Sequence, residues 1–131
     1  MFYQQVIAIH INIRSLPKNF DKLNILLGQL LEIQIIPDAI LLCETFLTET
    51  NKNLYNIENY SFVGINRIHH KGGGVGMYIR NIYNFKLRND LNIYRESNFE
   101  YIVAEISFHK TKLYIAEIYH IPGTNVLESL H

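Results

Sequence analysis

The sequence has one cysteine, no long apolar run and no net charge. Because Cys43 has no partner, an internal disulfide is excluded and a reducing compartment is favoured. No apolar run approaches the ~20 residues that span a bilayer, so we expect no transmembrane segment and no membrane partner. The N-terminus also lacks the basic and apolar regions of a signal peptide, which predicts an intracellular protein.

Low-complexity segments, internal repeats and linkers are absent as well, so the 131 residues predict one compact domain. A net charge of zero argues against a protein that binds nucleic acid through bulk electrostatics alone. The charge is uneven, however, because one segment contains five basic residues and no acidic one. This basic segment consists of Arg67, Lys71, Arg80, Lys86 and Arg88. It predicts either an anion-binding patch or a solvated basic hairpin, and the pattern alone favours the hairpin.

The first 44 residues predict a βαβ unit. We expect a strand over Tyr3–Ile13, a helix over Lys18–Gln34 with leucines at helical spacing, and a buried strand over Ala39–Cys43. Either Ser15 or Asn19 is expected to cap the helix. The two strands should run parallel in a sheet that is covered on both faces.

The rest of the chain predicts a loop over Thr48–Asn59 and a series of short strands. The expected strands are Tyr60–Asn66, Val75–Arg80, Phe85–Arg88, Tyr101–Phe108 and Lys112–Tyr119, the last two forming a hairpin. The class is α/β with one mixed sheet or two sheets, and two are favoured. The glycines at 72, 73, 74 and 76 precede a strand rather than a helix. They therefore predict a turn and a close backbone approach, not a phosphate-binding loop.

Two polar residues end the strands of the βαβ unit, Asn12 and Glu44. Ligands of open α/β sheets bind beyond the carboxyl ends of the strands, so neighbouring strands would bring this amide and this carboxylate together. Mg²⁺ prefers such oxygen ligands and often takes only one or two carboxylates. The alternative is structural, with Glu44 capping the next loop and Asn12 bonding to the backbone.

Other polar residues can serve the same site. Arg14 can pair with phosphate, Tyr119 at the end of a strand can donate a hydrogen bond to a phosphoryl oxygen, and the adjacent His120 can touch phosphate. Packing is the alternative role of Tyr119. His10 shares a strand face with Asn12, yet we expect it to be a packed core imidazole, and we expect Cys43 to be a buried hydrophobe rather than a nucleophile.

Several segments together resemble a known superfamily. They are "HINIRSLPKNFDKL", "PDAILLCETFLT", "NYSFVGINR", "KGGGVGMYIR" and "IAEIYHIPG", and their order and spacing are similar to those of endonuclease/exonuclease/phosphatase domains, in particular those of non-LTR retrotransposons. The resemblance implies a DNase I-like, four-layered α/β sandwich of two mixed sheets with flanking helices. It also implies magnesium-dependent cleavage of phosphodiester bonds in DNA, and a nuclear location. By resemblance, Asn12 contacts phosphate and metal, Glu44 binds metal, and Tyr119 lies near the scissile phosphate.

The sequence also departs from the superfamily pattern. Phe46 replaces a tryptophan, and His120-Ile121 replace an Arg-Pro pair, which removes a fixed cation. The later "GDFN"-like and Asp-His motifs have no counterpart in the 131 residues. We therefore expect residues 1–131 to be the truncated, N-terminal portion of a single domain, catalytically incomplete and with an exposed sheet edge open to self-association.

Three alternatives stay open at this point. The chain can be a fragment of a sister nuclease or phosphatase in the same superfamily. It can be a non-catalytic module that binds DNA through the basic segment between Arg67 and Arg88. It can also be a fragment with no selected function.

Overall fold

The computed structural model describes residues 5–65, 73–90 and 99–120. These residues form a mixed α/β fold with one helix and two sheets, which confirms the predicted class and the favoured division into two sheets. The elements are, in chain order, β1 (Ala8–Asn12), α1 (Leu16–Glu32), β2 (Ala39–Cys43), β3 (Tyr60–Ile65), β4 (Val75–Arg80), β5 (Asn84–Leu87), β6 (Phe99–Phe108) and β7 (Thr111–His120).

The four-stranded sheet has the order β1-β2-β4-β3. Its strands β1 and β2 are parallel, as the βαβ pattern predicts, whereas β4 runs antiparallel to both β2 and β3. The three-stranded sheet has the order β5-β6-β7 and is antiparallel throughout. The predicted hairpin is confirmed, since β6 and β7 pair over their full length from Phe99↔His120 to Phe108↔Thr111.

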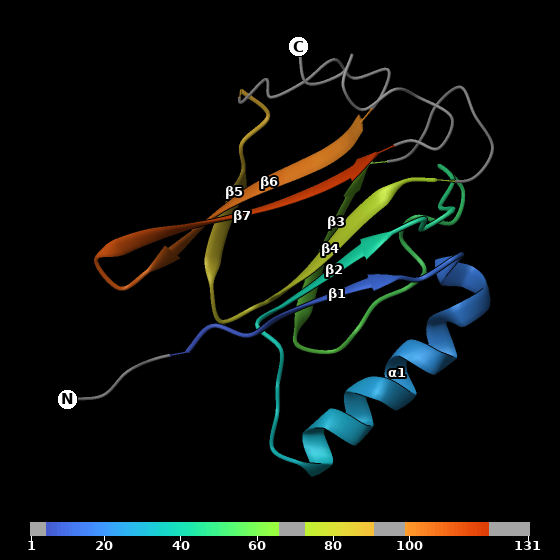
Figure 1. The fold of residues 1–131 in the computed structure, drawn as a ribbon, viewed down its shortest axis with the longest axis horizontal. Helices are drawn as coiled ribbons and strands as arrows, with labels where there is room; N and C mark the ends of the chain where they lie inside the picture. Colours follow the sequence, from blue (N-terminus) through green and yellow to red (C-terminus); the bar gives the residue numbers. More distant parts are fainter. Residues whose placement is uncertain (1–4, 66–72, 91–98, 121–131) are drawn as a thin grey trace.

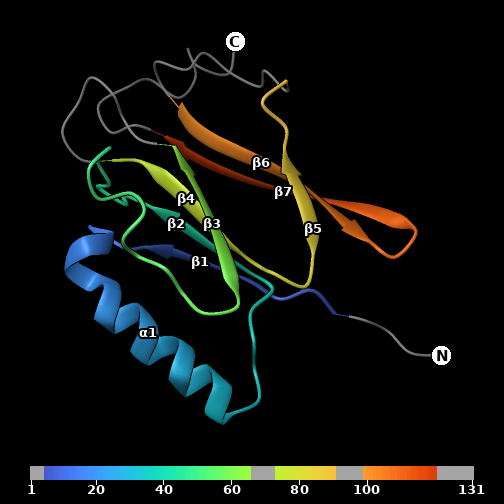
Figure 2. The ribbon, with the colours of Figure 1, turned by 180° about the vertical axis from the view of Figure 1, so that it is seen from behind.

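The described elements form three layers (Figures 1 and 2). Helix α1 covers one face of the four-stranded sheet through a cluster that we call the helix-side core, which includes Leu16, Leu23, Ile40, Leu42 and Tyr78. The opposite face of this sheet packs on the three-stranded sheet through the inter-sheet core, which includes Cys43, Val75, Met77, Ile79, Ile102, Ala104 and Ile106. Strands β2 and β4 contribute to both cores and are the most deeply buried part of the four-stranded sheet.

Helix α1 begins two residues earlier than predicted because Ser15 is its N-cap. The Ser15 hydroxyl accepts a hydrogen bond from the Lys18 N–H at 3.3 Å, and a proline stands in the first turn. Asn19, the other candidate cap, instead donates to the carbonyl oxygens of Ile13 and Arg14. Among the residues that the structure describes, no helix is both long enough and apolar enough to cross a membrane.

The prediction of a long, doubly buried first strand is wrong. Strand β1 spans only Ala8–Asn12 and lies at the edge of its sheet, so its side chains alternate between half-buried and exposed. Ile9 and Ile11 pack toward α1, whereas His10 and Asn12 are exposed on the other face. Apolar content alone did not distinguish this edge strand from the buried strand β2.

The glycines allow a close approach within the four-stranded sheet, as predicted. Gly64 and Gly76 pair across β3 and β4 beneath the ring of Phe62, and a Cβ atom at Gly76 would lie 2.6 Å from that ring. Gly73 and Gly74 have φ angles of 73° and 90°, in the left-handed region that glycine adopts at little cost. This turn leads directly into β4.

A buried carboxylate fixes the starts of β1 and β2. Asp38, only 5% exposed, accepts hydrogen bonds from the Ile7 N–H at 2.8 Å, from the Tyr83 hydroxyl at 2.7 Å and from Arg80 at 3.3 Å. These contacts join the residue before β1, the residue before β2 and the end of β4. They favour the register in which β1 and β2 end side by side.

Candidate functional site

The carboxyl ends of β1, β2 and β7 lie at the same end of the molecule (Figures 1 and 2). Asn12 pairs with Cys43 in the parallel ladder, so it stands next to Glu44 along the sheet edge. The contact continues past both strands, since the Ser15 N–H donates to the Glu44 carbonyl at 2.8 Å. The backbones of Asn12 and Glu44 therefore lie side by side, as the predicted parallel pairing of the two strands requires.

The polar side chains at these strand ends are accessible. Asn12 and Arg14 are exposed, and Glu44 is half-buried. Among the described residues, neither the Asn12 amide nor the Glu44 carboxylate has a hydrogen-bond or ion-pair partner. Their oxygens are thus available to a ligand, and neither makes the capping or backbone contact that the structural alternative requires.

The backbone at this end is unusually strained. Arg14, Ser15, Glu44 and Phe46 all have positive φ angles, between 49° and 89°. A left-handed conformation costs a non-glycine residue of the order of 1 kcal/mol or more, and such residues gather at binding and catalytic sites.

The face of β1 and β2 that meets the three-stranded sheet carries several ionisable groups. Cys43 is 3% exposed in the inter-sheet core, as predicted for a buried hydrophobe. Burial, followed by the negative charges of Glu117, Glu44 and Glu100, raises the pKa of the Cys43 thiol to about 11.

Glu100 is a buried carboxylate that the sequence reasoning missed. It is 8% exposed and accepts the Gly74 N–H at 3.0 and 3.2 Å. The same turn also binds the segment after Glu44. The Thr45 N–H donates to the Gly74 carbonyl, and the Phe46 N–H donates to the Gly73 carbonyl. Glu100 on β6 thus supports the end of β2 through the glycine turn.

Tyr119 and His120 end β7. Tyr119 pairs with Glu100 across the hairpin, is half-buried and packs against the inter-sheet core. His120 is half-buried. The centroids of its ring and the Phe99 ring lie 5.2 Å apart in an edge-on contact. The structure therefore brings Tyr119 to the same end as Asn12 and Glu44, while the ring of His120 packs against β6.

Glu117, two residues before Tyr119, is the second carboxylate that the sequence reasoning missed. It is 2% exposed, and burial raises its pKa to about 8. Its Oε2 lies 3.4 Å from Nε2 of His10. The strand period could have located it, because Leu113 and Ile115 face inward and Glu117 follows at the same spacing. The prediction that His10 is a core imidazole is wrong, because its side chain is 53% exposed.

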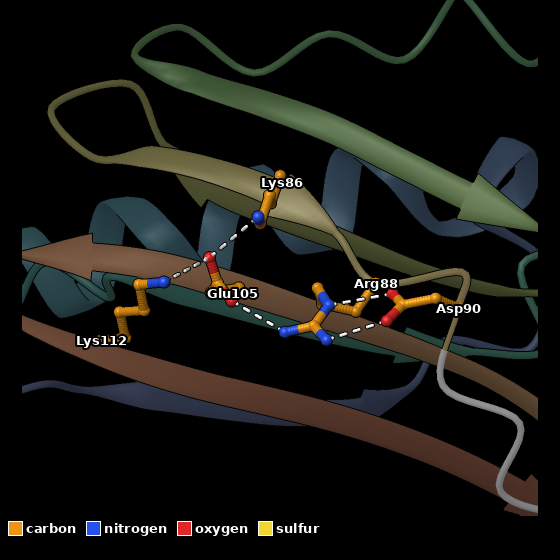
Figure 3. Close-up of polar contacts among 5 residues, drawn as sticks. All are labelled: Lys86, Arg88, Asp90, Glu105 and Lys112. Atoms are coloured by element: carbon orange, nitrogen blue, oxygen red, sulfur yellow. Dashed lines mark hydrogen bonds and ion pairs between the residues drawn. The ribbon is translucent and has the colours of Figure 1, made fainter.

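The basic segment does not form one free cationic surface among the described residues. Arg80 pairs with Asp38, and Arg67 and Lys71 lie outside the described residues. Lys86 and Arg88 gather with Lys112 around Glu105, which is 5% exposed (Figure 3). The Arg88 guanidinium also donates two hydrogen bonds to the Asp90 carboxylate. These bonds lower the pKa of Asp90 to about 2.

Within residues 5–65, 73–90 and 99–120, no three His, Cys, Asp or Glu side chains are grouped closely enough to hold a metal ion. The sequence matches no protein-family model and no curated protein. The polar groups of the predicted site are those at the ends of β1, β2 and β7.

Proposed function

We propose that this chain is part of an endonuclease/exonuclease/phosphatase domain, with a magnesium-dependent site for phosphodiesters at the ends of β1, β2 and β7. The observation that carries the proposal is the parallel pairing that sets Asn12 beside Glu44 at one sheet edge. This edge is where open α/β sheets bind their ligands. The helix layer and the two packed sheets are compatible with part of a four-layered sandwich.

The available oxygens fit the chemistry of Mg²⁺. The half-buried Glu44 carboxylate and the Asn12 amide would hold the ion, which supplies Lewis-acid stabilisation of the phosphoryl oxygens. The Tyr119 hydroxyl would donate a hydrogen bond to a phosphoryl oxygen, and Arg14 would pair with a neighbouring phosphate. His120 is the weaker phosphate contact, because its ring packs against Phe99.

The proposed site lacks a general base within the 131 residues. None of the Asp-Asn and Asp-His motifs of the superfamily occurs in the sequence. General acid–base assistance alone is worth about a hundredfold to ten-thousandfold in rate. We therefore expect this chain to bind Mg²⁺ and phosphodiesters without useful turnover. DNA as the partner and the nucleus as the location follow from the resemblance only.

A purely DNA-binding role is less well supported. Glu105 and Asp90 already neutralise much of the charge of Lys86, Arg88 and Lys112 (Figure 3). Basic side chains bind DNA by pairing with its phosphates and releasing the small cations that surround it. Side chains already paired with carboxylates do this poorly. The chain can also be part of a sister nuclease or phosphatase of the same superfamily. That interpretation is included in the proposal, because such an enzyme would use the same metal site.

The proposal is tested by titrating the full 131-residue chain with Mg²⁺ and following the backbone amide signals by NMR. We expect the largest shifts at Asn12 and Glu44, and at least tenfold weaker binding in Glu44→Gln, which removes the charge but keeps the size. Glu58→Gln is the matched control, because Glu58 is an exposed carboxylate in the loop before β3. Its binding should equal that of the wild type.

A second assay measures magnesium-dependent nicking of supercoiled DNA by the same proteins. We expect none from the wild-type chain. Nicking that Glu44→Gln abolishes would contradict the expected inactivity and support the site. Unchanged amide signals at Asn12 and Glu44 across the Mg²⁺ titration would refute the proposed site.

A further inference from the structure

Glu117 is a buried carboxylate without a hydrogen bond. Its side chain is only 1% exposed, and neither of its oxygens accepts a hydrogen bond of normal geometry from the described residues. The Gly76 amide is near enough to offset part of the burial effect on its pKa, yet it does not satisfy either oxygen. Burial of the charged form is costly unless the group keeps its proton, as its raised pKa favours, or binds a cation.

The nearest ionisable group is the imidazole of His10. Nε2 of His10 lies 3.4 Å from Oε2 of Glu117, but the contact does not qualify as a hydrogen bond. Two atoms bound to the same tetrahedral zinc ion, at about 2.0–2.1 Å each, lie about 3.3 Å from one another. The two side chains are thus spaced as neighbouring ligands rather than aligned as donor and acceptor.

Other carboxylates influence the same core, because Glu44, Glu100 and Glu117 all help to raise the pKa of the Cys43 thiol in the inter-sheet core. Among the described residues, His10 is the only ion-pair partner of Glu117. A bound cation would take the place of the Glu117 proton and contact the carboxylate oxygens, which accept no hydrogen bond from the described residues. We propose that His10 and Glu117 bind one divalent cation of the zinc class, with water completing its coordination.

The ligand types favour zinc over magnesium at this pair. Imidazole nitrogen suits zinc and its neighbours in the transition series, whereas Mg²⁺ takes oxygen ligands. His10 is 53% exposed on an edge strand, which gives the ion a route from solvent to the buried oxygen. This pair is separate from the magnesium ligands proposed above, although Asn12 follows His10 on the same face of β1.

The inference is tested by calorimetric titration of the full chain with Zn²⁺. We expect one site whose affinity falls at least tenfold in His10→Gln and in Glu117→Gln. His109→Gln is the matched control, because His109 is an exposed histidine at the β6–β7 turn, and it should bind as the wild type does. Glu44→Gln should also retain Zn²⁺, which separates this site from the proposed magnesium site.

A measurement on the unsubstituted chain guards against variants that fail to fold. The imidazole nitrogen signals of His10, followed by NMR, should shift on adding one equivalent of Zn²⁺, with Nε2 shifting most. Unaltered His10 signals, or wild-type affinity in both His10→Gln and Glu117→Gln, would overturn the inference. Loss of Zn²⁺ binding in Glu44→Gln alone would also overturn it, since the ion would then occupy the other site.

Discussion

Replacing Asp38 with alanine should destabilise the fold by about 4 kcal/mol. The side chain is 5% exposed and accepts three hydrogen bonds, from the Ile7 N–H, the Tyr83 hydroxyl and Arg80. Removing one partner of a buried ion pair costs about 3–5 kcal/mol, and each donor left without an acceptor adds to that cost. Domains are stable by only about 5–15 kcal/mol, so the loss would be a large part of the total.

Urea unfolding followed by circular dichroism measures this effect. Asp90→Ala is the control, because Asp90 also pairs with an arginine at 2.8 Å but is 63% exposed. Its urea midpoint should stay close to that of the wild type. Asp38→Asn should fall between the two, since the amide keeps one acceptor. If Asp38→Ala and Asp90→Ala unfold at the same urea concentration, the argument from burial is refuted.

Two further predictions concern the cores. Because burial and nearby carboxylates raise the pKa of Cys43 to about 11, the native thiol should react with Ellman's reagent far more slowly at pH 8 than the thiol of the urea-unfolded chain; equal rates would contradict the buried placement. Gly76→Ala should cost about 1–3 kcal/mol in urea unfolding, because its Cβ would lie 2.6 Å from the ring of Phe62, and Phe62→Leu should reduce that cost. An unchanged midpoint in Gly76→Ala would show that the ring moves aside freely.

Local sequence patterns predicted most of the elements. Leucine spacing located α1, the apolar run located β2, and alternation with a short turn located the β6–β7 hairpin. The parallel pairing of β1 with β2 followed from the βαβ order, and with it the meeting of the Asn12 and Glu44 backbones. These features depend on residues within single elements or between consecutive elements. Local residue spacing therefore predicts them.

The errors arose where one sheet meets the other. The sequence predicts a core position for His10, but β1 is an edge strand and the His10 side chain is 53% exposed. Glu100 and Glu117 lie inside strands rather than at the polar strand ends that predict the site, so the sequence does not single them out. Their importance depends on which strand of one sheet lies over which strand of the other. For Glu100 the contact is with Gly74, 26 positions away, and for Glu117 it is with His10, 107 positions away, so no local pattern encodes that relation.

The β6–β7 hairpin has a consequence for the order in which the chain folds. Its ten paired positions are joined by a two-residue turn, so it can form within microseconds from contacts that are local in sequence. The four-stranded sheet must instead close much longer stretches of chain, since β4 inserts between β2 and β3. Cys43, Glu100 and Glu117 come together only when both sheets have docked. A chain that has formed the hairpin alone therefore carries Tyr119, Glu100 and Glu117, but these residues reach their contacts with β1, β2 and β4 only after the sheets dock.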